Sequence, residues 1–554
     1  MAISPAPSLN ALIEASCETF ADRPALGFAF QKSLTYKEMQ QEILKVAVGL
    51  RKAGIGQDAR VAILAESSPR WSIAYFGVVW IGAVVIPILP DFTESDVLHI
   101  LRDAGAEAIF TTGKQLEKLT ELTGEIAQRV ITLDDADGPD EIIKTITFTG
   151  FVEGHGDETP LLVEFDSDHP ASIIYTSGTS GHSKAVVLSH GNLAANVESA
   201  RGLVEIKPDW TFLSVLPISH TYEFTVGLLL PLRQGARVVY CDKRPTPLVL
   251  EKICAAEHPT VMCVVPMIME KIYKKKILPT LKKSKVLQIL LGLPFLRALV
   301  LTKIGRKLKG FFGGQLELMA IGGAALNIEV ERFLKESNFP YLVGYGLTET
   351  SPLLAGGPAG DPTIALGSCG KPVPGVSIKI VDPNPISGVG AIYGKGPNVM
   401  KGYFNNHNLT AETIDHEGWL ATGDLGRFDE LGNLHITGRS KSLIVLSHGE
   451  NIYPETLEEK FNSSIYVSES LVTESKDQLT ATIVPDYEAI DLETTDKSEE
   501  EKLAHIHALL KEIKISVNLQ LPTYSQIHHV VERQEPFIKT ATQKIKRYLY
   551  TASS

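Results

Sequence analysis

Residues 173–191, IIYTSGTSGHSKAVVLSHG, combine glycines, hydroxyls and a lysine in an order that suits the binding of an anion. Glycines let the backbone approach an oxyanion closely, so that successive N–H groups can converge on a phosphate. The residues expected to hold phosphate are Thr176, Ser177, Gly178, Thr179, Ser180, Gly181 and Lys184, the last adding a positive charge. A hairpin turn rich in serine and glycine is the alternative. A Walker A loop is excluded because no hydroxyl follows Lys184.

Two strings downstream carry groups that could contact a nucleoside. LMAIGGAA is expected to form a strand that ends in Gly322, Gly323 and Ala324, where a flat base or an acyl chain could lie against the backbone. WLATGDLG places Asp424 in a turn flanked by glycines, and one carboxylate can accept from both ribose hydroxyls. The alternative for Asp424 is a turn in which the carboxylate caps its own backbone.

The string GYGLTE, residues 344–349, follows a predicted strand at 341–343. Tyr345 has a glycine on each side, the second being Gly346, so its ring could stack on adenine. The hydroxyl of Thr348 can donate to an α-phosphate, and the carboxylate of Glu349 is a hard oxygen ligand suited to Mg²⁺.

Together these strings resemble the adenylate-forming superfamily, which includes acyl-CoA synthetases, luciferases and the adenylation domains of peptide synthetases. The strings GYGLTETSP and LPISHTYEF are most similar to long-chain fatty acyl-CoA synthetases. The resemblance implies activation of a carboxylic acid, a medium- or long-chain fatty acid, to acyl-AMP with release of pyrophosphate, and then thioester formation with CoA. ATP, Mg²⁺ and CoA are the cofactors and co-substrate that it implies.

The same resemblance assigns roles to residues that carry little signal alone. A histidine after a strand is usually a packing residue, and the lysines near the C-terminus could form a basic tail. By resemblance, His220 lies beside the acyl pocket and the small C-terminal domain pivots at one lysine. The residues so assigned are Lys544, Thr348 and His220 as catalytic, Arg439 as nucleotide-binding, Glu349 and Thr176 as metal-binding, and Lys441 as the hinge.

The chain departs from the family pattern at two places. In the phosphate loop the family usually has x-Pro-Lys-Gly, whereas this chain has His182-Ser183-Lys184-Ala185, so the usual proline and the last glycine are missing. Near the C-terminus, Gln543 precedes Lys544 where the family usually has glycine. These departures motivate one alternative, a nucleotide-binding regulator with weakened catalysis. A second alternative is an acyl-AMP ligase that transfers to the phosphopantetheine thiol of a carrier protein.

Alternation of helix-like and strand-like segments predicts an α/β fold with parallel sheets and helices on both faces. We expect a large N-terminal adenylation domain, residues 1–438, with two parallel-type α/β sheets and a small β-barrel at about 365–435. A hinge at 439–441 would join it to a small, mobile α+β domain, residues 442–554. Residues 112–168 are acidic and punctuated, and we expect a surface excursion there.

Composition narrows the class of protein further. The 554 residues carry a net charge of −12, which argues against a nucleic-acid partner. Five scattered cysteines without a C-x-x-C suit a reducing cytosol, so we expect a cytoplasmic protein. The N-terminus lacks a secretory signal pattern, and the uncharged run at 71–90 is interpreted as a short helix and a core strand interrupted by Gly82 and Pro87, instead of a membrane span.

Residues 271–313 stand apart because they contain many lysines and arginines, interleaved with apolar runs, and no acid. One interpretation is peripheral contact with an anionic membrane, which would suit a lipid substrate. The alternative is a pair of helices that pack their apolar faces on the core and expose their charges to solvent.

Overall fold

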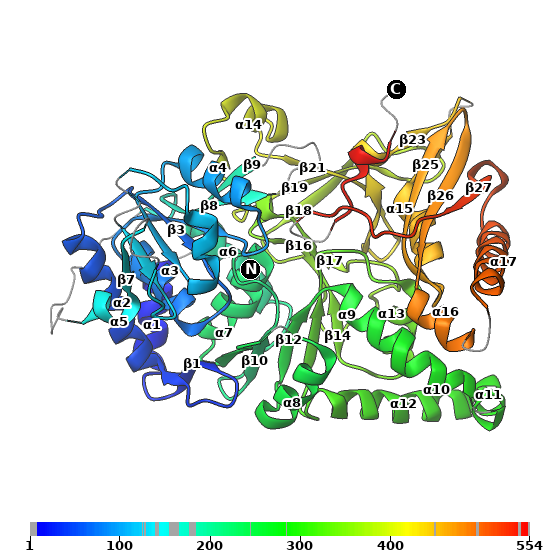
Figure 1. Ribbon diagram of the computed structural model, residues 1–554, viewed down its shortest axis with the longest axis horizontal. Helices are drawn as coiled ribbons and strands as arrows, with labels where there is room; N and C mark the ends of the chain where they lie inside the picture. Colours follow the sequence, from blue (N-terminus) through cyan, green and yellow to red (C-terminus); the bar gives the residue numbers. More distant parts are fainter. Residues whose placement is uncertain are drawn as a thin grey trace.

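The computed structural model describes residues 8–124, 126, 129–138, 143–153, 166–176, 184–243, 245–283, 285–447, 450–494, 498–540 and 544–551. Figure 1 shows a large body, coloured blue to yellow, and a smaller C-terminal part, orange to red, on its right side. The large body contains two mostly parallel sheets with helices on their faces. The predicted α/β fold class is thereby confirmed, while the exact domain boundaries stay predictions.

The first sheet has eight strands in the order β20-β9-β8-β4-β3-β5-β6-β7. All neighbours are parallel except β9, which runs antiparallel to both β8 and β20. The strands are β3 (Arg60–Leu64), β4 (Val84–Ile88), β5 (Ala108–Thr111), β6 (Val130–Thr132), β7 (Thr145–Thr147), β8 (Pro170–Thr176), β9 (Lys184–Ser189) and β20 (Gly402–Tyr403). The prediction of a surface excursion over 112–168 is wrong where β6 and β7 extend this sheet, because three-residue strands leave no periodic signal.

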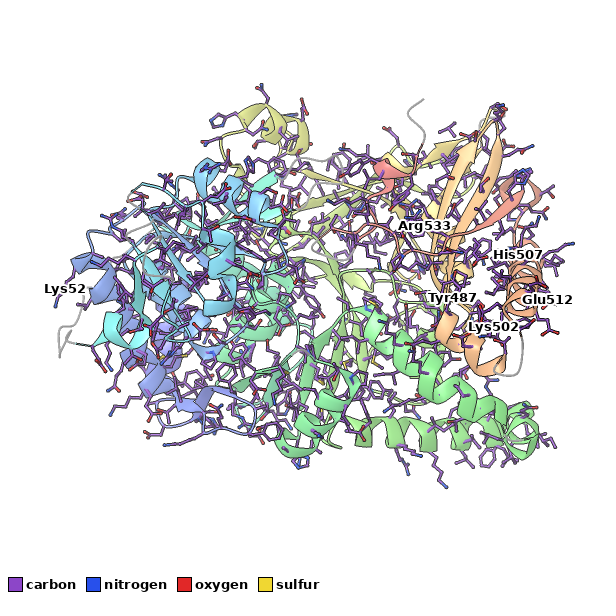
Figure 2. All side chains as sticks on the ribbon, viewed as in Figure 1. Lys52, Tyr487, Lys502, His507, Glu512 and Arg533 are labelled. Atoms are coloured by element: carbon purple, nitrogen blue, oxygen red, sulfur yellow. The ribbon has the colours of Figure 1, made fainter. Side chains whose placement is uncertain are left out.

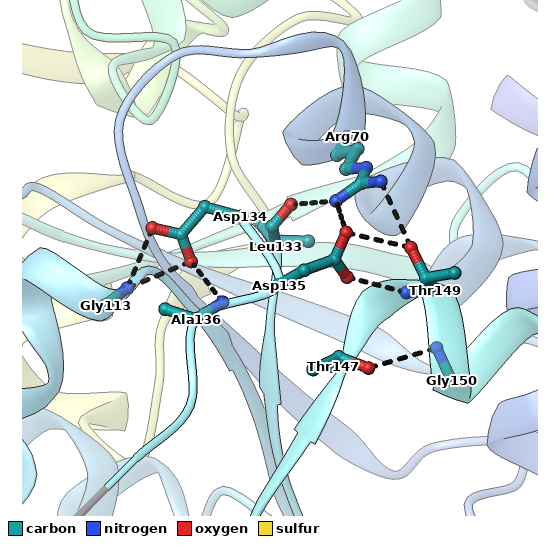
Figure 3. Close-up of polar contacts among 9 residues, drawn as sticks. All are labelled: Arg70, Gly113, Leu133, Asp134, Asp135, Ala136, Thr147, Thr149 and Gly150. Carbon is teal, nitrogen blue, oxygen red and sulfur yellow. Dashed lines mark hydrogen bonds and ion pairs between the residues drawn. The ribbon is translucent and has the colours of Figure 1, made fainter.

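Polar contacts fasten that edge of the sheet to a neighbouring helix (Figure 3). Arg70 donates to the carboxylate of Asp135 at 2.7 Å and to the carbonyl oxygen of Leu133 at 2.8 Å. Asp135 in turn accepts from the backbone N–H and the hydroxyl of Thr149, both at 2.8 Å. These contacts explain why an acidic stretch joins the fold instead of extending into solvent.

The second sheet has seven strands in the order β14-β13-β12-β10-β11-β1-β2, parallel except at β1–β2. Its short apolar strands were expected from local sequence at residues 237–240 and 261–266. The strands are β1 (Pro24–Phe28), β2 (Leu34–Thr35), β10 (Thr211–Ser214), β11 (Arg237–Tyr240), β12 (Val261–Val264), β13 (Leu318–Ile321) and β14 (Tyr341–Val343).

One hydrophobic core joins the two sheets through the helices between them. The uncharged run from Trp71 forms α3 (Pro69–Trp80) and then strand β4, all buried, as its interpretation predicted. Over the residues that the structure describes, none of the helices has both the length and the apolar character needed to cross a bilayer. The other helical segments of this body are α1 (Leu9–Thr19), α2 (Tyr36–Lys52), α4 (Glu94–Ala104), η1 (Gly113–Leu119), α5 (Phe148–Val152), α6 (His190–Arg201), the π-helical η3 (Glu223–Leu229), α7 (Leu230–Arg233), α8 (Pro247–Glu257) and α13 (Ile328–Glu336).

Two antiparallel sheets occupy the region where a small barrel was expected. They share a core of Ala355, Ile392 and Leu434. The three-stranded sheet contains β15 (Tyr345–Gly346), β16 (Leu353–Gly356) and β17 (Lys371–Pro372). The four-stranded sheet contains β18 (Ser377–Val381), β19 (Gly390–Lys395), β21 (Leu420–Phe428) and β22 (Leu434–Arg439), with η5 (Thr348–Thr350) and α14 (His407–Thr413) nearby in sequence.

The basic segment forms a chain of helices along the lower edge of the molecule in Figure 1. Its elements are α9 (Pro266–Ile272), the π-helical η4 (Tyr273–Ile277), α10 (Leu278–Lys283), α11 (Lys285–Gly292) and α12 (Pro294–Phe311). Helix α12 buries Leu301 and Leu308 against the second sheet's core, so its inner face packs as a solvated helix would.

The C-terminal part has a core of its own. Within this part, Tyr487 of α16 (Tyr487–Glu493), which is labelled in Figure 2, donates from its hydroxyl to Glu532 of β27 (His529–Glu532) at 2.8 Å. Its elements are η6 (Ser440–Ser442), β23 (Ile444–Val445), β24 (Asn451–Ile452), α15 (Pro454–Asn462), β25 (Val467–Ser475), β26 (Gln478–Pro485), α16 (Tyr487–Glu493), α17 (Glu499–Asn518), η7 (Thr523–Ser525), β27 (His529–Glu532) and η8 (Arg547–Leu549).

Candidate active site

A cleft of about 3710 Å³ lies between the large body and the C-terminal part. Ser177, Gly178, Thr179, Ser180 and Gly181 lie outside the described residues. The remaining predicted site residues all line this cleft: Thr176, Lys184, His220, Gly322, Gly323, Ala324, Tyr345, Gly346, Thr348, Glu349, Asp424, Arg439, Lys441 and Lys544. Residues spread from position 176 to position 544 are thus brought to one cavity.

The two ends of the predicted phosphate loop face each other across β8 and β9. Thr176 and Lys184 are register partners, and the Thr176 hydroxyl donates to the Lys184 carbonyl oxygen at 3.4 Å. Burial lowers the pKa of the Lys184 ammonium, while the negative charge of Glu349 opposes that shift. Lys184 therefore sits beside a carboxylate at the cleft wall, where a phosphate could be a second anionic neighbour.

Tyr403 connects Lys184 to Glu349 and was missed by sequence reasoning. The Lys184 ammonium donates to the Tyr403 hydroxyl at 3.3 Å, and that hydroxyl donates to Glu349 Oε1 at 3.0 Å. The ammonium also lies 4.8 Å from the centre of the Tyr403 ring, a cation–π distance. Strand β20 pairs with β9 and so carries Tyr403 to this position. Its only sequence signal was a tyrosine after a glycine in KGYFNN.

Asp424 lies at the centre of a second polar cluster and is 4% exposed. Its Oδ1 pairs with the Arg439 Nε at 2.9 Å, and its Oδ2 accepts from the Tyr345 hydroxyl at 2.7 Å. Asp424 and Arg439 stand opposite each other in the β21–β22 register, which fixes the ion pair. Burial raises the pKa of Asp424 more than Arg439 and Tyr345 lower it.

The GYG string is shaped by backbone contact. A Cβ on Gly346 would lie 1.9 Å from the carbonyl oxygen of Pro352, so only glycine fits there. The antiparallel β15–β16 pairing that brings this backbone close also orients Tyr345 toward Asp424. The glycine next to Tyr345 therefore serves the placement of the tyrosine hydroxyl as well as access to its ring.

Lys544 reaches the same cavity from the C-terminal part. Its backbone N–H donates to the Thr540 hydroxyl at 3.2 Å, and its carbonyl oxygen accepts from the Thr540 N–H at 2.8 Å. The Lys544 ammonium is surrounded by protein atoms of the cavity wall, and the resulting desolvation is the main cause that lowers the Lys544 pKa. The positive charge of Arg439 lowers this pKa further. Asp424 and Glu349 act in the opposite direction. A cation is thereby held among the groups proposed to bind a nucleotide.

His220 lines the cleft and is half-buried. Burial, and then the positive charge of Lys544, lowers its pKa to about 4, so the ring is neutral at neutral pH. The Tyr222 backbone N–H donates to His220 Nδ1 at 3.2 Å, which leaves the ring proton on Nε2. His220 can therefore donate one hydrogen bond from Nε2 without carrying a charge.

The wall beyond His220 is apolar. It is formed by residues of α6, β10, η3 and β13, together with neighbouring loops, and includes Ala200, Leu203, Val204, Ile206, Phe212, Val226, Leu230 and Leu318. The cleft lining thus combines the polar groups that bind or move charge with a set of apolar side chains. This arrangement can accept a molecule that has an anionic head and an apolar body.

The oxygen donors that the described residues place in the cleft fit a magnesium ion that is held partly by substrate phosphates, and they do not form a site made of protein ligands alone. Within the described part of the chain, no three His, Cys, Asp or Glu side chains gather as a metal site. Mg²⁺ commonly binds one or two carboxylates together with substrate phosphates and water. Glu349 supplies one carboxylate at the cleft wall, and Thr176 supplies a hydroxyl at the edge of the predicted phosphate loop.

Lys274 fastens the C-terminal part to the large body. Its ammonium donates to the backbone carbonyl oxygens of Ser464 at 3.0 Å and Val467 at 3.4 Å, and also to that of Asn462. Sequence reasoning placed Lys274 in a solvated or lipid-facing helix and missed this contact. Further hydrogen bonds between the two parts join Asn327 to Ser463, Ile328 to Glu459 and Thr456 to Thr437.

Comparison with known proteins defines the class. Residues 13–404 match the family model described as AMP-binding enzyme. The chain is 29% identical over 482 residues to a long-chain-fatty-acid–CoA ligase of Mycobacterium bovis, covering 83% of this chain and 78% of the relative. It is 29% identical over 476 residues to a 4-coumarate–CoA ligase of Vanilla planifolia, covering 83% of this chain and 80% of that enzyme.

Solved structures give the same result for the fold. The ATP-bound RpMatB-BxBclM chimera B1 has a TM-score of 0.78 at 25% identity, with 98% of each chain covered. An anthranilate CoA ligase in complex with anthranoyl-AMP has a TM-score of 0.79 at 20% identity, covering 99% of this chain and 97% of that one.

The fold is that of adenylate-forming enzymes. The chain belongs to the AMP-binding enzyme family, and it is an AMP-forming acid–CoA ligase. The predicted resemblance and the predicted enzyme class are confirmed.

Proposed function

We propose that the chain activates a medium- or long-chain fatty acid with ATP and transfers the acyl group to CoA. The observation that carries this proposal is the cleft itself, in which Lys184, Arg439 and Lys544 lie near the carboxylates of Asp424 and Glu349 and share the lining with apolar side chains. Two comparisons support the proposal: one relative is a long-chain-fatty-acid–CoA ligase, and one similar solved structure is named as bound to ATP. Mg²⁺ is the metal that we assign to Glu349 and Thr176.

In the first half-reaction a carboxylate oxygen attacks the α-phosphorus of ATP, the bond to the β-phosphate oxygen breaks, and pyrophosphate leaves. Two anions must approach each other, so positioning and charge neutralisation supply most of the acceleration. Lys184 and the phosphate loop hold the β- and γ-phosphates. Mg²⁺, when bound, neutralises phosphate charge. Lys544 and Thr348 stabilise the charge on the α-phosphate and the carboxylate, and no protein nucleophile is needed.

Adenosine is oriented by the cluster around Asp424. The carboxylate accepts from ribose hydroxyls through lone pairs that Tyr345 and Arg439 leave available, and the Tyr345 ring flanks the base. Gly322, Gly323 and Ala324 provide a flat backbone surface for the base or the acyl chain. His220 is neutral, and it positions the carboxylate of the acid by donating one hydrogen bond, without neutralising the negative charge of that carboxylate.

In the second half-reaction the CoA sulfur attacks the acyl carbon of acyl-AMP and the thiol proton passes to solvent, while the bond from that carbon to the phosphate oxygen breaks and AMP leaves. We propose that the C-terminal domain turns at Lys441 between the two steps, withdrawing Lys544 and opening a path for the thiol. Closure in each orientation also keeps water away from the reactive anhydride.

The choice of acid is the finer part of the proposal. The apolar wall favours a hydrophobic acid over acetate, but related enzymes are named for 4-coumarate and anthranilate as well as for long-chain fatty acids. Acid-dependent exchange of labelled pyrophosphate into ATP should be measured with C2 to C18 fatty acids, benzoate, anthranilate and 4-coumarate. We expect the highest kcat/KM among medium- or long-chain acids, and a preference for an aromatic acid would contradict this assignment.

The acceptor thiol requires a separate assay. We propose CoA because the named relatives are CoA ligases. Thioester formation should be compared with CoA and with a phosphopantetheinylated carrier protein. A clear preference for the carrier protein would identify an acyl-AMP ligase, and failure of pyrophosphate exchange with every acid would favour the regulator.

We also propose a cytoplasmic location with peripheral membrane contact. All five cysteines are free thiols, which suits a reducing compartment. Fractionation of cells that express the tagged protein tests this location directly. The residues proposed to touch the membrane belong to only part of the basic segment.

A further inference from the structure

Helices α11 and α12 carry large apolar side chains that the core does not cover. Ile289 is 68% exposed, Leu293 51%, Phe295 76% and Leu299 56%. A single exposed apolar residue is ordinary on a protein surface, but four of them lie within residues 289–299 at the junction of two helices, and together they are called the exposed patch. Figure 1 places α11 at the lower right corner and α12 along the lower edge of the molecule.

The patch continues into positive charge along α12. Phe295, Leu299 and Lys303 follow one another at four-residue intervals, so they share one helix face. Lys303, Arg306 and Lys307 are exposed. Among the described residues, no acidic side chain pairs with any of these three cations.

Acids on neighbouring elements pair with other cations of α12, whereas Lys303, Arg306 and Lys307, beyond the exposed patch, have no ion pair among the described residues. Arg297 pairs with Glu336 of α13 at 2.7 Å, and Lys309 pairs with Glu317 at 3.3 Å. Residues 271–313 themselves contain no acid, although the protein carries a net charge of −12. An anionic partner is therefore attracted to this edge while the rest of the molecule repels it.

The same layer of helices borders the active-site cleft. Lys271 and Lys275, Leu278 and Pro279, and Phe311 from the end of α12 all contribute to the cleft wall. The hairpin and this side of the cleft wall thus belong to one run of helices, with the exposed patch at the start of α12 and the cleft-lining Phe311 at its end. This continuity links the exposed patch to the handling of an apolar substrate.

We propose that the α11–α12 hairpin docks on an anionic lipid bilayer. Ile289, Leu293, Phe295 and Leu299 enter the boundary between headgroups and acyl chains, and the cations at 303, 306 and 307 contact lipid phosphates. Docking itself does not depend on the proposed function; only the delivery of a fatty acid to the cleft rests on it. A second copy of this chain fits less well, because two such hairpins would bring like charges together.

The test is co-sedimentation of the full chain with phosphatidylcholine vesicles that contain or lack phosphatidylglycerol, at low and high salt. Binding should require the anionic lipid and weaken with salt. The variant Lys303→Gln/Arg306→Gln/Lys307→Gln should lower the partition coefficient by about fivefold for each cation removed, on the order of a hundredfold in total. The variant Phe295→Glu/Leu299→Glu should abolish sedimentation.

Matched controls come from exposed residues elsewhere. Ile386 and Leu519 are 97% and 83% exposed, so their change to glutamate adds the same charge away from the hairpin. Changing Lys32, Lys37 and Arg51 to glutamine removes three cations at or near α2, on the opposite side in Figure 1. All of these controls should still sediment.

Three results would overturn the proposal: no sedimentation of the wild type with anionic vesicles, equal binding to neutral vesicles, or hairpin variants that bind as the controls do. Gel filtration of the same samples identifies a further contradiction, in which the hairpin variants lose self-association instead of lipid binding. Pyrophosphate exchange with a soluble short acid, measured in parallel, reports whether the proposed function fails independently of docking.

Discussion

Replacing Tyr403 by phenylalanine removes one oxygen atom from the contact between Lys184 and Glu349. In the native protein the tyrosine hydroxyl accepts from the ammonium at 3.3 Å and donates to the carboxylate at 3.0 Å. The ring stays in place, because Tyr403 is 5% exposed and packs in the core, so the cation–π contact at 4.8 Å survives. The variant therefore tests the hydroxyl alone.

A hydrogen bond to a charged group contributes about 1.5–3 kcal/mol, and the longer bond from Lys184 contributes at the lower end. Water in the open cleft can replace the lost donor to Glu349, which reduces the net effect. We therefore expect a loss of about 1.5 kcal/mol in transition-state stabilisation, or about tenfold in kcat/KM for ATP. The loss should be confined to adenylate formation, because Lys184 and Glu349 are proposed to act on phosphates and metal.

Tyr403→Phe should be measured by pyrophosphate exchange at varied ATP and Mg²⁺, and by thioester formation from supplied acyl-AMP. Tyr393→Phe is the matched control, since Tyr393 lies near Lys379 in the small antiparallel sheet and not at the phosphate end of the cleft. The control should keep both rates. Unchanged kcat/KM for ATP in Tyr403→Phe, or equal loss in both half-reactions, would refute the assigned link.

Two further predictions concern the domain contact and a buried acid. Lys274→Ala should reduce adenylate formation by about tenfold and spare thioester formation from acyl-AMP, because charge-assisted hydrogen bonds to the C-terminal part are lost. Lys45→Ala, which removes only an ion pair within α2, should leave both rates unchanged. Glu223 is 1% exposed, and burial raises its pKa from 4.5 to about 8, so the folded state holds a proton that the unfolded state releases. Stability is then lost as pH rises from about 4.5 to about 8, by up to about 5 kcal/mol at 1.36 kcal/mol per pH unit. Glu223→Gln should therefore raise Tm more at pH 8 than at pH 5, and an equal change at both pH values would show that the carboxyl ionises normally.

Local sequence predicted the sheets well where strands are short apolar runs. The runs 60–65, 171–175 and 261–266 each became a buried parallel or paired strand, since β-branched residues in a row are stable only between layers. Regions that lack such runs were predicted less well. Strands β6 and β7 escaped notice, and residue propensities do not separate a π-helical turn, such as the one at 223–229, from an ordinary helix.

The site was predictable to the extent that its residues cluster in short strings. GYGLTE and the glycine-flanked Asp424 each carry several chemical groups within a few positions, and both line the cleft. Tyr403 could not be found in this way, because its partners lie 219 and 54 residues away in sequence. Lys274 was hidden among other lysines, and only the packed structure separates Lys274 and Lys275, which contact the C-terminal part, from lysines that face solvent.

The central claim is that Lys544 serves the first half-reaction alone. It is tested most directly by measuring both half-reactions of Lys544→Ala with the preferred acid. We expect pyrophosphate exchange to fall by about 100-fold or more, as is typical when a group that stabilises developing charge is removed, while thioester formation from supplied acyl-AMP stays within about twofold. An equal loss in the two assays would contradict the account, because it would mean that Lys544 stabilises the folded enzyme or takes part in both half-reactions, instead of serving adenylate formation alone.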